Sequence, residues 1–82
     1  MTLTLFYKPT CPYCQKVLRF MQTQDITLAM KNVQETPAFR EELIRIGGKS
    51  QVPCLVIDGK AMYESDDIVA WLDKNVNKAK KS

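Results

Sequence analysis

Two kinds of hydrophobic pattern follow one another along this chain: runs in which polar and apolar residues alternate, and runs in which apolar residues recur at helical spacing. The run Thr2 to Phe6 alternates polar and apolar residues and predicts a first strand. From Pro12 to about Gln24, apolar side chains recur at helical spacing and predict a first helix. The run Thr27 to Lys31 predicts a second strand, with Leu28 and Met30 directed inward. These elements form a βαβ unit, whose two strands should be parallel.

The second half of the chain carries clear start and stop signals. The pair Thr36-Pro37 predicts a second helix with a hydroxyl cap, and Gly47-Gly48 predicts its end. Two strand-like runs, Cys54–Ile57 and Lys60–Tyr63, flank Asp58-Gly59, which predicts a hairpin with a tight primed turn.

A last amphipathic helix follows a cluster of acidic residues. Ser65 is a good N-cap, and Asp66 and Asp67 would complement the positive end of the helix dipole. The predicted fold class is therefore α/β, with the order β-α-β-α-β-β-α and a four-stranded mixed sheet flanked by three helices. No repeat or linker interrupts this order, so we expect residues 1–82 to form one domain. The residues expected to face the sheet are Phe39, Leu43 and Ile46 in the second helix and Ile68, Val69, Leu72 and Val76 in the third.

Composition narrows the classes of function. The chain has 82 residues, of which 45% are hydrophobic and 26% charged, which is typical of a small globular domain. Its formal net charge is +3, but Lys78, Lys80 and Lys81 lie in what we expect to be a solvated tail, and no basic stripe indicates a nucleic-acid partner. No apolar run has membrane-spanning length, and the first residues do not match a secretory signal. We therefore expect a cytoplasmic protein with reduced thiols.

Two cysteines carry the candidate chemistry. Cys11 and Cys14 are separated by two residues between a predicted strand and helix, the redox signature of a thioredoxin-like βαβ unit. At a helix start, the free backbone N–H groups and the helix dipole would stabilise the Cys11 thiolate, whereas Cys14 would be shielded one turn further in. Cys11 would then attack a disulfide, and Cys14 would resolve the mixed disulfide.

Other interpretations of the cysteines compete with this one. A structural zinc site normally needs four ligands, but the chain has three cysteines and no histidine. A structural disulfide across so short a loop would remove little entropy from the unfolded chain. A pair of core cysteines fits poorly with the proline between them. We interpret Cys54, in a short apolar run, as a buried core thiol, and Trp71 as a packing or surface residue.

Three separated stretches, Cys11-Pro12-Tyr13-Cys14, Gln51-Val52-Pro53 and Glu64-Ser65-Asp66-Asp67, together resemble the glutaredoxin family over essentially the whole chain. The first is the dithiol active-site sequence of that family. Gln-Val-Pro followed by Glu-Ser also resembles the N-terminal domain of glutathione transferases. The resemblance implies a thioredoxin-like fold, glutathione as co-substrate and no metal.

The resemblance also implies roles for individual residues. Pro53 would be cis and face Cys11, and the backbone of Val52 would pair with the cysteinyl part of glutathione. Ser65 and Asp66 match the positions that hold the γ-glutamyl end.

The remaining implied contacts are polar or aromatic. Lys8 would favour either the Cys11 thiolate or the glycine carboxylate of glutathione, and Tyr13 would line the groove. In transferase-like relatives, residues at the positions of Gln51 and Glu64 contact glutathione. Without the other motifs, these residues are better explained by roles other than ligand binding: Ser65 as a helix cap, Asp66 and Asp67 as partners of the helix dipole, and Lys8 as a solvated side chain.

We interpret the chain as a small, monomeric dithiol glutaredoxin that reduces glutathionylated and disulfide-containing proteins. One alternative is a glutathione-binding module like a transferase N-terminal domain, although no second helical domain follows before Ser82. The other is an iron–sulfur carrier, against which Pro12 argues, because cluster-binding relatives usually have a smaller or more flexible residue there. The electron donor is either glutathione or a thioredoxin-type reductase.

Overall fold

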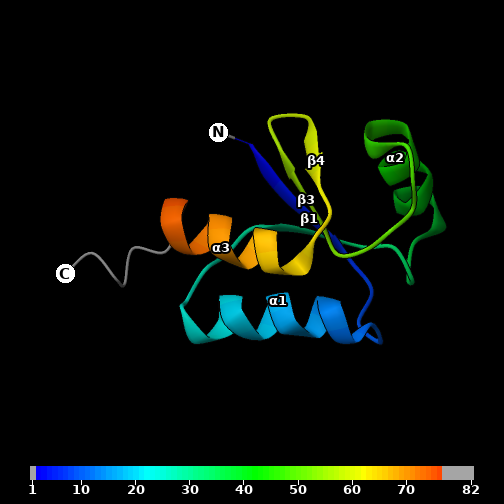
Figure 1. The fold of residues 1–82 in the computed structure, drawn as a ribbon. Helices are drawn as coiled ribbons and strands as arrows, with labels where there is room; N and C mark the ends of the chain where they lie inside the picture. The colour runs from blue at the N-terminus through cyan, green and yellow to red at the C-terminus, as the bar shows by residue number, and fades with distance from the viewer. Residues whose placement is uncertain (1, 77–82) are drawn as a thin grey trace.

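The computed structural model describes residues 2–76, in which strands and helices follow one another in the predicted order (Figure 1). The strands are β1 (Leu3–Tyr7), β2 (Ala29–Asn32), β3 (Cys54–Ile57) and β4 (Lys60–Met62), and the helices are α1 (Pro12–Thr23), α2 (Pro37–Gly47) and α3 (Ser65–Asn75). Within these residues the strands form one sheet in the order β2-β1-β3-β4. β1 is parallel to β2 and antiparallel to β3, so the predicted mixed α/β sheet is confirmed.

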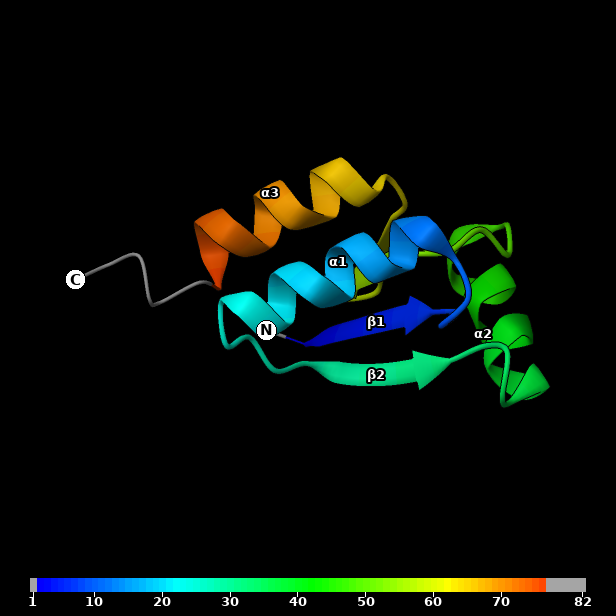
Figure 2. The ribbon, with the colours of Figure 1, turned by 90° about the horizontal axis from the view of Figure 1, so that it is seen from below.

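Buried side chains cover both faces of the sheet because they alternate along its two central strands. Leu5 of β1 pairs with Leu55 of β3, and both pack with α1 and α3, which lie side by side (Figure 2). The neighbouring residues Phe6 and Cys54 face the other way and pack with Leu43 of α2. The sheet is thus held between two helices on one face and one helix on the other.

Part of the sequence prediction for the edge strand β2 is wrong. Pairing of Thr4 with Ala29 starts β2 two residues later than expected. Leu28 packs against the core as predicted, but Met30 is 38% exposed, because β2 is the edge strand and leaves this side chain at the margin of the sheet. Lys31 of the same strand pairs instead with Glu42 of α2, with 2.7 Å between nitrogen and oxygen.

The ends of the other elements differ from the predictions by about one residue. β1 extends to Tyr7, because this residue pairs with Asn32, and β4 ends at Met62. The hairpin turn between β3 and β4 has positive φ at both Asp58 (49°) and Gly59 (86°), which confirms the primed turn.

The predicted helix caps are confirmed only in part. The N-cap of α3 is Glu64 and not Ser65, because the Glu64 carbonyl already accepts the first helical hydrogen bond from the N–H of Ile68 at 2.9 Å. Thr36 is the N-cap of α2 as predicted, but among the described residues its hydroxyl makes no capping hydrogen bond. Gly48 ends α2 with a φ of 87°, as predicted.

The part of the chain that the structure describes contains no helix long and apolar enough to cross a membrane. The tail lysines Lys78, Lys80 and Lys81 lie outside the described residues.

Candidate active site

The cysteine pair lies at the start of α1, after the turn that follows β1. The arrowheads of β1 and β2 in Figure 2 point to the end of the molecule at which α1 begins. The backbone N–H of Cys11 donates to the carbonyl of Lys8 at 3.0 Å and closes the intervening turn. Cys11 is the N-cap of α1, and Pro12 takes the first helical position, where a missing N–H costs no helical hydrogen bond. The sequence prediction for this segment is confirmed.

Cys11 has a partly exposed thiol that ionises easily. Burial is the largest single influence and raises the pKa of Cys11. Hydrogen bonds from the backbone and thiol of Cys14 and from the backbone of Tyr13, together with the charge of Lys8, outweigh burial. The net pKa therefore lies below the ordinary 9.0.

Cys14 is the opposite kind of thiol. It is completely buried, and its sulfur accepts the backbone N–H of Lys8 at 3.4 Å. Burial is the largest influence and, with the nearby Cys11, raises the pKa of Cys14 to about 12 against the backbone hydrogen bond and the charge of Lys8, which lower it. The two thiols of one motif are therefore chemically unequal, as the position at a helix start predicted.

The loop before β3 brings a second segment against Cys11. The Val52–Pro53 peptide bond is cis, as the resemblance implied, and Pro53 is buried. The Cys11 thiol donates a weak hydrogen bond to the Val52 carbonyl, with 3.9 Å from sulfur to oxygen. Gln51 precedes them and is exposed. The Val52 carbonyl thus lies next to the Cys11 sulfur.

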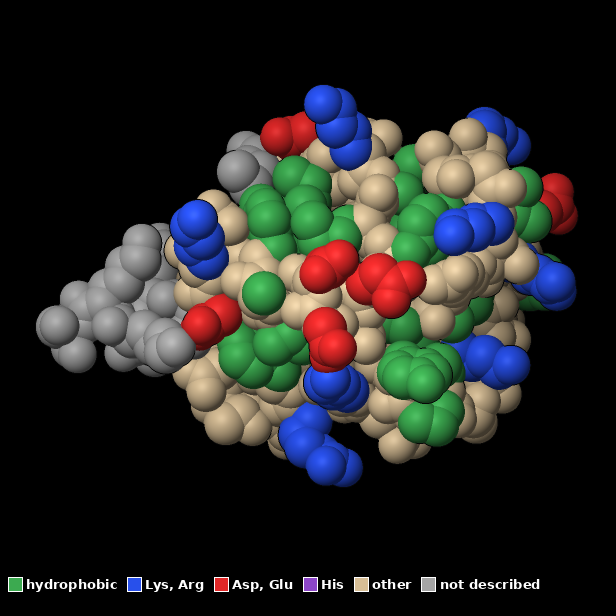
Figure 3. Space-filling view, in the orientation of Figure 1, with side chains coloured by type: hydrophobic (Ala, Val, Ile, Leu, Met, Phe, Trp, Pro, Cys, Tyr) green, Lys and Arg blue, Asp and Glu red, His purple; other side chains and the backbone are tan. Residues whose placement is uncertain are grey.

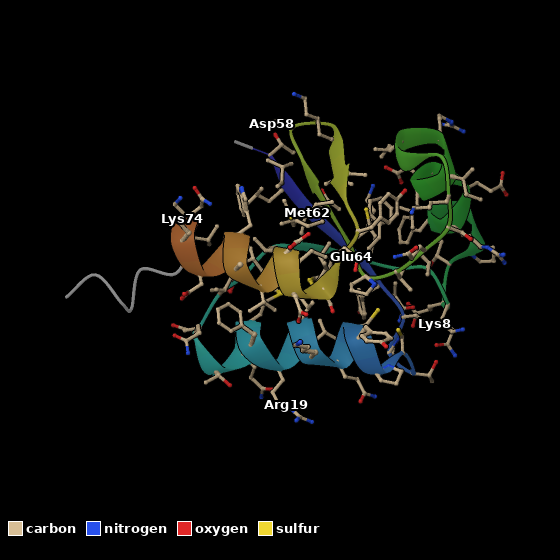
Figure 4. The ribbon with its side chains drawn as sticks, in the orientation of Figure 1. Lys8, Arg19, Asp58, Met62, Glu64 and Lys74 are labelled. Carbon is tan, nitrogen blue, oxygen red and sulfur yellow. The ribbon has the colours of Figure 1, made fainter. Side chains whose placement is uncertain are left out.

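The predicted polar residues of α3 form a second group, at its first turn. Glu64 and Asp66 are exposed and Ser65 is half-buried. The Asp66 carboxylate pairs with Lys16 of α1, so it bridges the two helices. Figure 3 shows acidic side chains gathered over this turn, and Figure 4 shows Glu64 and Lys8 at the end of the molecule where α1 and α3 begin.

Tyr13 projects from the first turn of α1 and is 65% exposed. Its ring leaves an apolar surface in water two residues after Cys11. Hydrogen bonds join Lys8 to Cys14 and Cys11 to Val52, so the structure brings these four residues together.

Sequence reasoning missed a groove of about 450 Å³ on the α2 side of the site. It is lined by Lys8, Val33, Gln34, Pro37, Arg40, Ser50 and Val52. Two of its residues, Lys8 and Val52, also contact the cysteine pair, so the groove opens beside Cys11 and Cys14. Arg40 places a second cation there. The predicted topology could have indicated this groove. The parallel strands β1 and β2 have their carboxyl ends side by side, and α2 starts after β2.

The three cysteines, all within the described residues, are free thiols. Cys54 is completely buried, and burial raises its pKa to about 11, which agrees with a core thiol. In residues 2–76 no three His, Cys, Asp or Glu side chains gather in a way that could hold a metal ion.

Comparison with known proteins finds a family model and relatives that all carry the name glutaredoxin or glutaredoxin-like. The family model of glutaredoxin matches residues 3–62. Glutaredoxin 3 of Escherichia coli (strain K12) is 29% identical over 66 residues, which cover 80% of this chain and 80% of that protein. An uncharacterized glutaredoxin-like 8.6 kDa protein in the rubredoxin operon of Clostridium pasteurianum is 29% identical over 76 residues, which cover 93% of this chain and 99% of that protein.

Among solved structures, glutathione S-transferase unclassified 2 from Bombyx mori matches with a TM-score of 0.79 and 19% identity. The match covers 95% of this chain but 37% of the transferase, and at this identity it shows the thioredoxin-like fold alone. The family model, by contrast, spans well over half of the 82 residues and includes the cysteine motif and the cis-proline loop. This chain belongs to the glutaredoxin family.

Proposed function

We propose that this chain is a glutathione-dependent thiol–disulfide oxidoreductase that reduces protein–glutathione mixed disulfides and protein disulfides through Cys11 and Cys14. The observation that carries the proposal is the inequality of the two thiols. Cys11 is accessible and has a lowered pKa, whereas Cys14 is buried and has a pKa of about 12. Thiolate attack therefore starts at Cys11, and Cys14 stays protonated until it is needed.

Reduction of a glutathionylated protein needs Cys11 alone. The Cys11 thiolate attacks the glutathione sulfur, the bond to the target sulfur breaks, and the target thiolate leaves and takes a proton from water. A thiolate of a second glutathione then attacks the sulfur of the bound glutathione. Oxidised glutathione is released with the Cys11 thiolate, so the mixed disulfide of the target has been exchanged for the disulfide of oxidised glutathione with the use of one free glutathione.

Reduction of a protein disulfide engages Cys14. Once Cys11 is part of a mixed disulfide, its negative charge and its hydrogen bond to Cys14 are lost. Both of these raise the pKa of Cys14, so this pKa falls in the intermediate. Cys14 then loses its proton more easily, attacks the Cys11 sulfur and expels the target thiolate. The formed Cys11–Cys14 disulfide is returned to two thiols by two molecules of glutathione.

Charge supports a glutathione site that spans both groups of residues. Glutathione carries two carboxylates and one ammonium group at neutral pH. The groove beside Cys11 offers Lys8 and Arg40 to the glycine carboxylate, and the Val52 backbone lies next to the reactive sulfur.

The first turn of α3 would receive the γ-glutamyl end, with backbone N–H groups for its carboxylate and Asp66 for its ammonium group. Ser65 and Glu64 lie in the same turn, and Gln51 and Tyr13 would border the bound tripeptide. The name of the Bombyx mori neighbour, a glutathione S-transferase, adds support for this ligand.

The proposal is tested by glutathione-dependent reduction of a glutathionylated peptide. Wild type and Cys14→Ser should turn over, and Cys11→Ser should be inactive, because Cys11 alone is required. Cys54→Ala serves as a matched cysteine control and should keep activity, since Cys54 is a buried core thiol that takes no part in the proposed steps. A wild type that is inactive with glutathione but active with a thioredoxin reductase would overturn the choice of electron donor.

A further inference from the structure

Tyr63 joins two loops on which the proposed glutathione site depends. It follows β4 and immediately precedes Glu64, the N-cap of α3. Its hydroxyl donates a hydrogen bond of 3.1 Å to the carbonyl of Lys49, in the loop between α2 and β3. That loop continues to Val52, whose carbonyl meets the Cys11 thiol. One side chain thus connects the segment beside the reactive sulfur to the start of α3.

The Tyr63 ring is fixed by packing as well as by this hydrogen bond. It lies against the core cluster of Phe6, Leu43, Cys54 and Val56. The Lys49 ammonium lies 4.6 Å from the centre of the ring, a favourable cation–π arrangement. Lys49 is therefore held to Tyr63 through both its backbone and its side chain. Burial is the largest influence that raises the pKa of Tyr63, so its hydroxyl keeps its proton and remains a donor at working pH.

Gly47 leaves room for the Tyr63 hydroxyl. Gly47 is the last residue of α2, and the left-handed conformation belongs to the next residue, Gly48. A Cβ atom at position 47 would overlap the hydroxyl oxygen of Tyr63 and would lie 3.0 Å from the Cβ of Ala61. The absence of a side chain at this position is therefore explained by the close approach of Tyr63 and not by backbone conformation.

We infer that Tyr63 is a positioning residue that fixes the Val52 loop relative to the first turn of α3 and thereby sets the affinity for glutathione. The inference rests on the proposed function. Glutathione has to contact both segments at once, so it is sensitive to their spacing. A small alkylating reagent needs only the Cys11 thiolate, which the Tyr63 hydroxyl does not contact.

The test compares Tyr63→Phe with wild type in two reactions. Loss of one hydrogen bond should raise the KM for glutathione by about threefold to tenfold, with kcat changed by less than about twofold. The rate of Cys11 alkylation by iodoacetamide should stay within about twofold of wild type. Gly47→Ala should give the same pattern although its tyrosine is intact, because the new Cβ displaces the hydroxyl.

Two controls separate positioning from a general loss of stability. Tyr7→Phe removes a hydroxyl from a half-buried tyrosine that packs on the other face of the sheet. Ile46→Val removes one methyl group from the same cluster that Tyr63 contacts. Both should leave the KM for glutathione within about twofold of wild type.

An unchanged KM in Tyr63→Phe, or an equal rise in the two controls, would overturn the inference while the proposed function stands. A parallel loss of alkylation rate would also overturn it, since this would indicate disturbance of Cys11 itself. A wild type that does not turn over glutathione would overturn the proposed function, and the inference with it.

Discussion

Selective alkylation is the sharpest consequence of the unequal thiols. The described residues include three free cysteines, but of these only Cys11 is both accessible and lowered in pKa. We therefore expect iodoacetamide to label folded, reduced protein at Cys11 alone, and unfolded protein at all three cysteines. The perturbation is pH, raised from 6 to 9 in steps at constant ionic strength.

The expected selectivity follows from the pKa values. Raising the pKa of Cys14 from 9.0 to about 12 lowers its thiolate fraction roughly a thousandfold at any pH below 9. The corresponding shift of Cys54 to about 11 lowers its thiolate fraction roughly a hundredfold. Cys11 shifts the other way, so its labelling rate should rise with pH and reach half of its plateau below pH 9.0. Burial of Cys14 and Cys54 slows the reagent further.

The assay is a timed quench followed by peptide mass spectrometry, which reports each cysteine separately. Cys11→Ser is the control, and its remaining two thiols should stay unlabelled in the folded state. Labelling of Cys14 or Cys54 within about tenfold of the Cys11 rate would refute the reasoning, as would a midpoint for Cys11 above pH 9.0.

Three further predictions concern charge and packing. Lys8→Met should move the alkylation midpoint of Cys11 to higher pH, because a charge that stabilises the thiolate is lost; an unchanged midpoint would contradict this. Leu43→Ala should lower the free energy of unfolding in urea by about 2–5 kcal/mol, since Leu43 is fully buried, whereas Ile44→Ala, at a side chain 42% exposed, should cost less than about 1 kcal/mol. Lys16→Met should change stability by less than about 1 kcal/mol, because its ion pair with Asp66 is exposed to solvent, and a loss above about 2 kcal/mol would be inconsistent with a surface pair.

Local chemistry explains what the sequence predicted well. The order of elements could be predicted from the spacing of apolar residues and from the turn residues. Asp58-Gly59 and Gly48 adopt the positive φ values that their residue types favour. The inequality of Cys11 and Cys14 followed from their spacing at a helix start. These features depend on residues close together in the chain, so a pattern of a few positions was sufficient.

Features that depend on distant residues were not predictable in the same way. Met30 belongs to an apolar run, but its exposure follows from the place of β2 at the edge of the sheet. Arg40 carries no motif, and it joins Lys8 only because α2 begins at the same end of the sheet as α1. The purpose of Gly47 became visible only with Tyr63 packed against it.

The central claim is that Cys11 forms a mixed disulfide with glutathione during turnover. The most direct measurement is the intact and peptide mass of Cys14→Ser after brief exposure to oxidised glutathione and acid quench. The account predicts one glutathionyl group, located on Cys11 and removed by added glutathione. No adduct, or an adduct on Cys54 with Cys11 free, would contradict it.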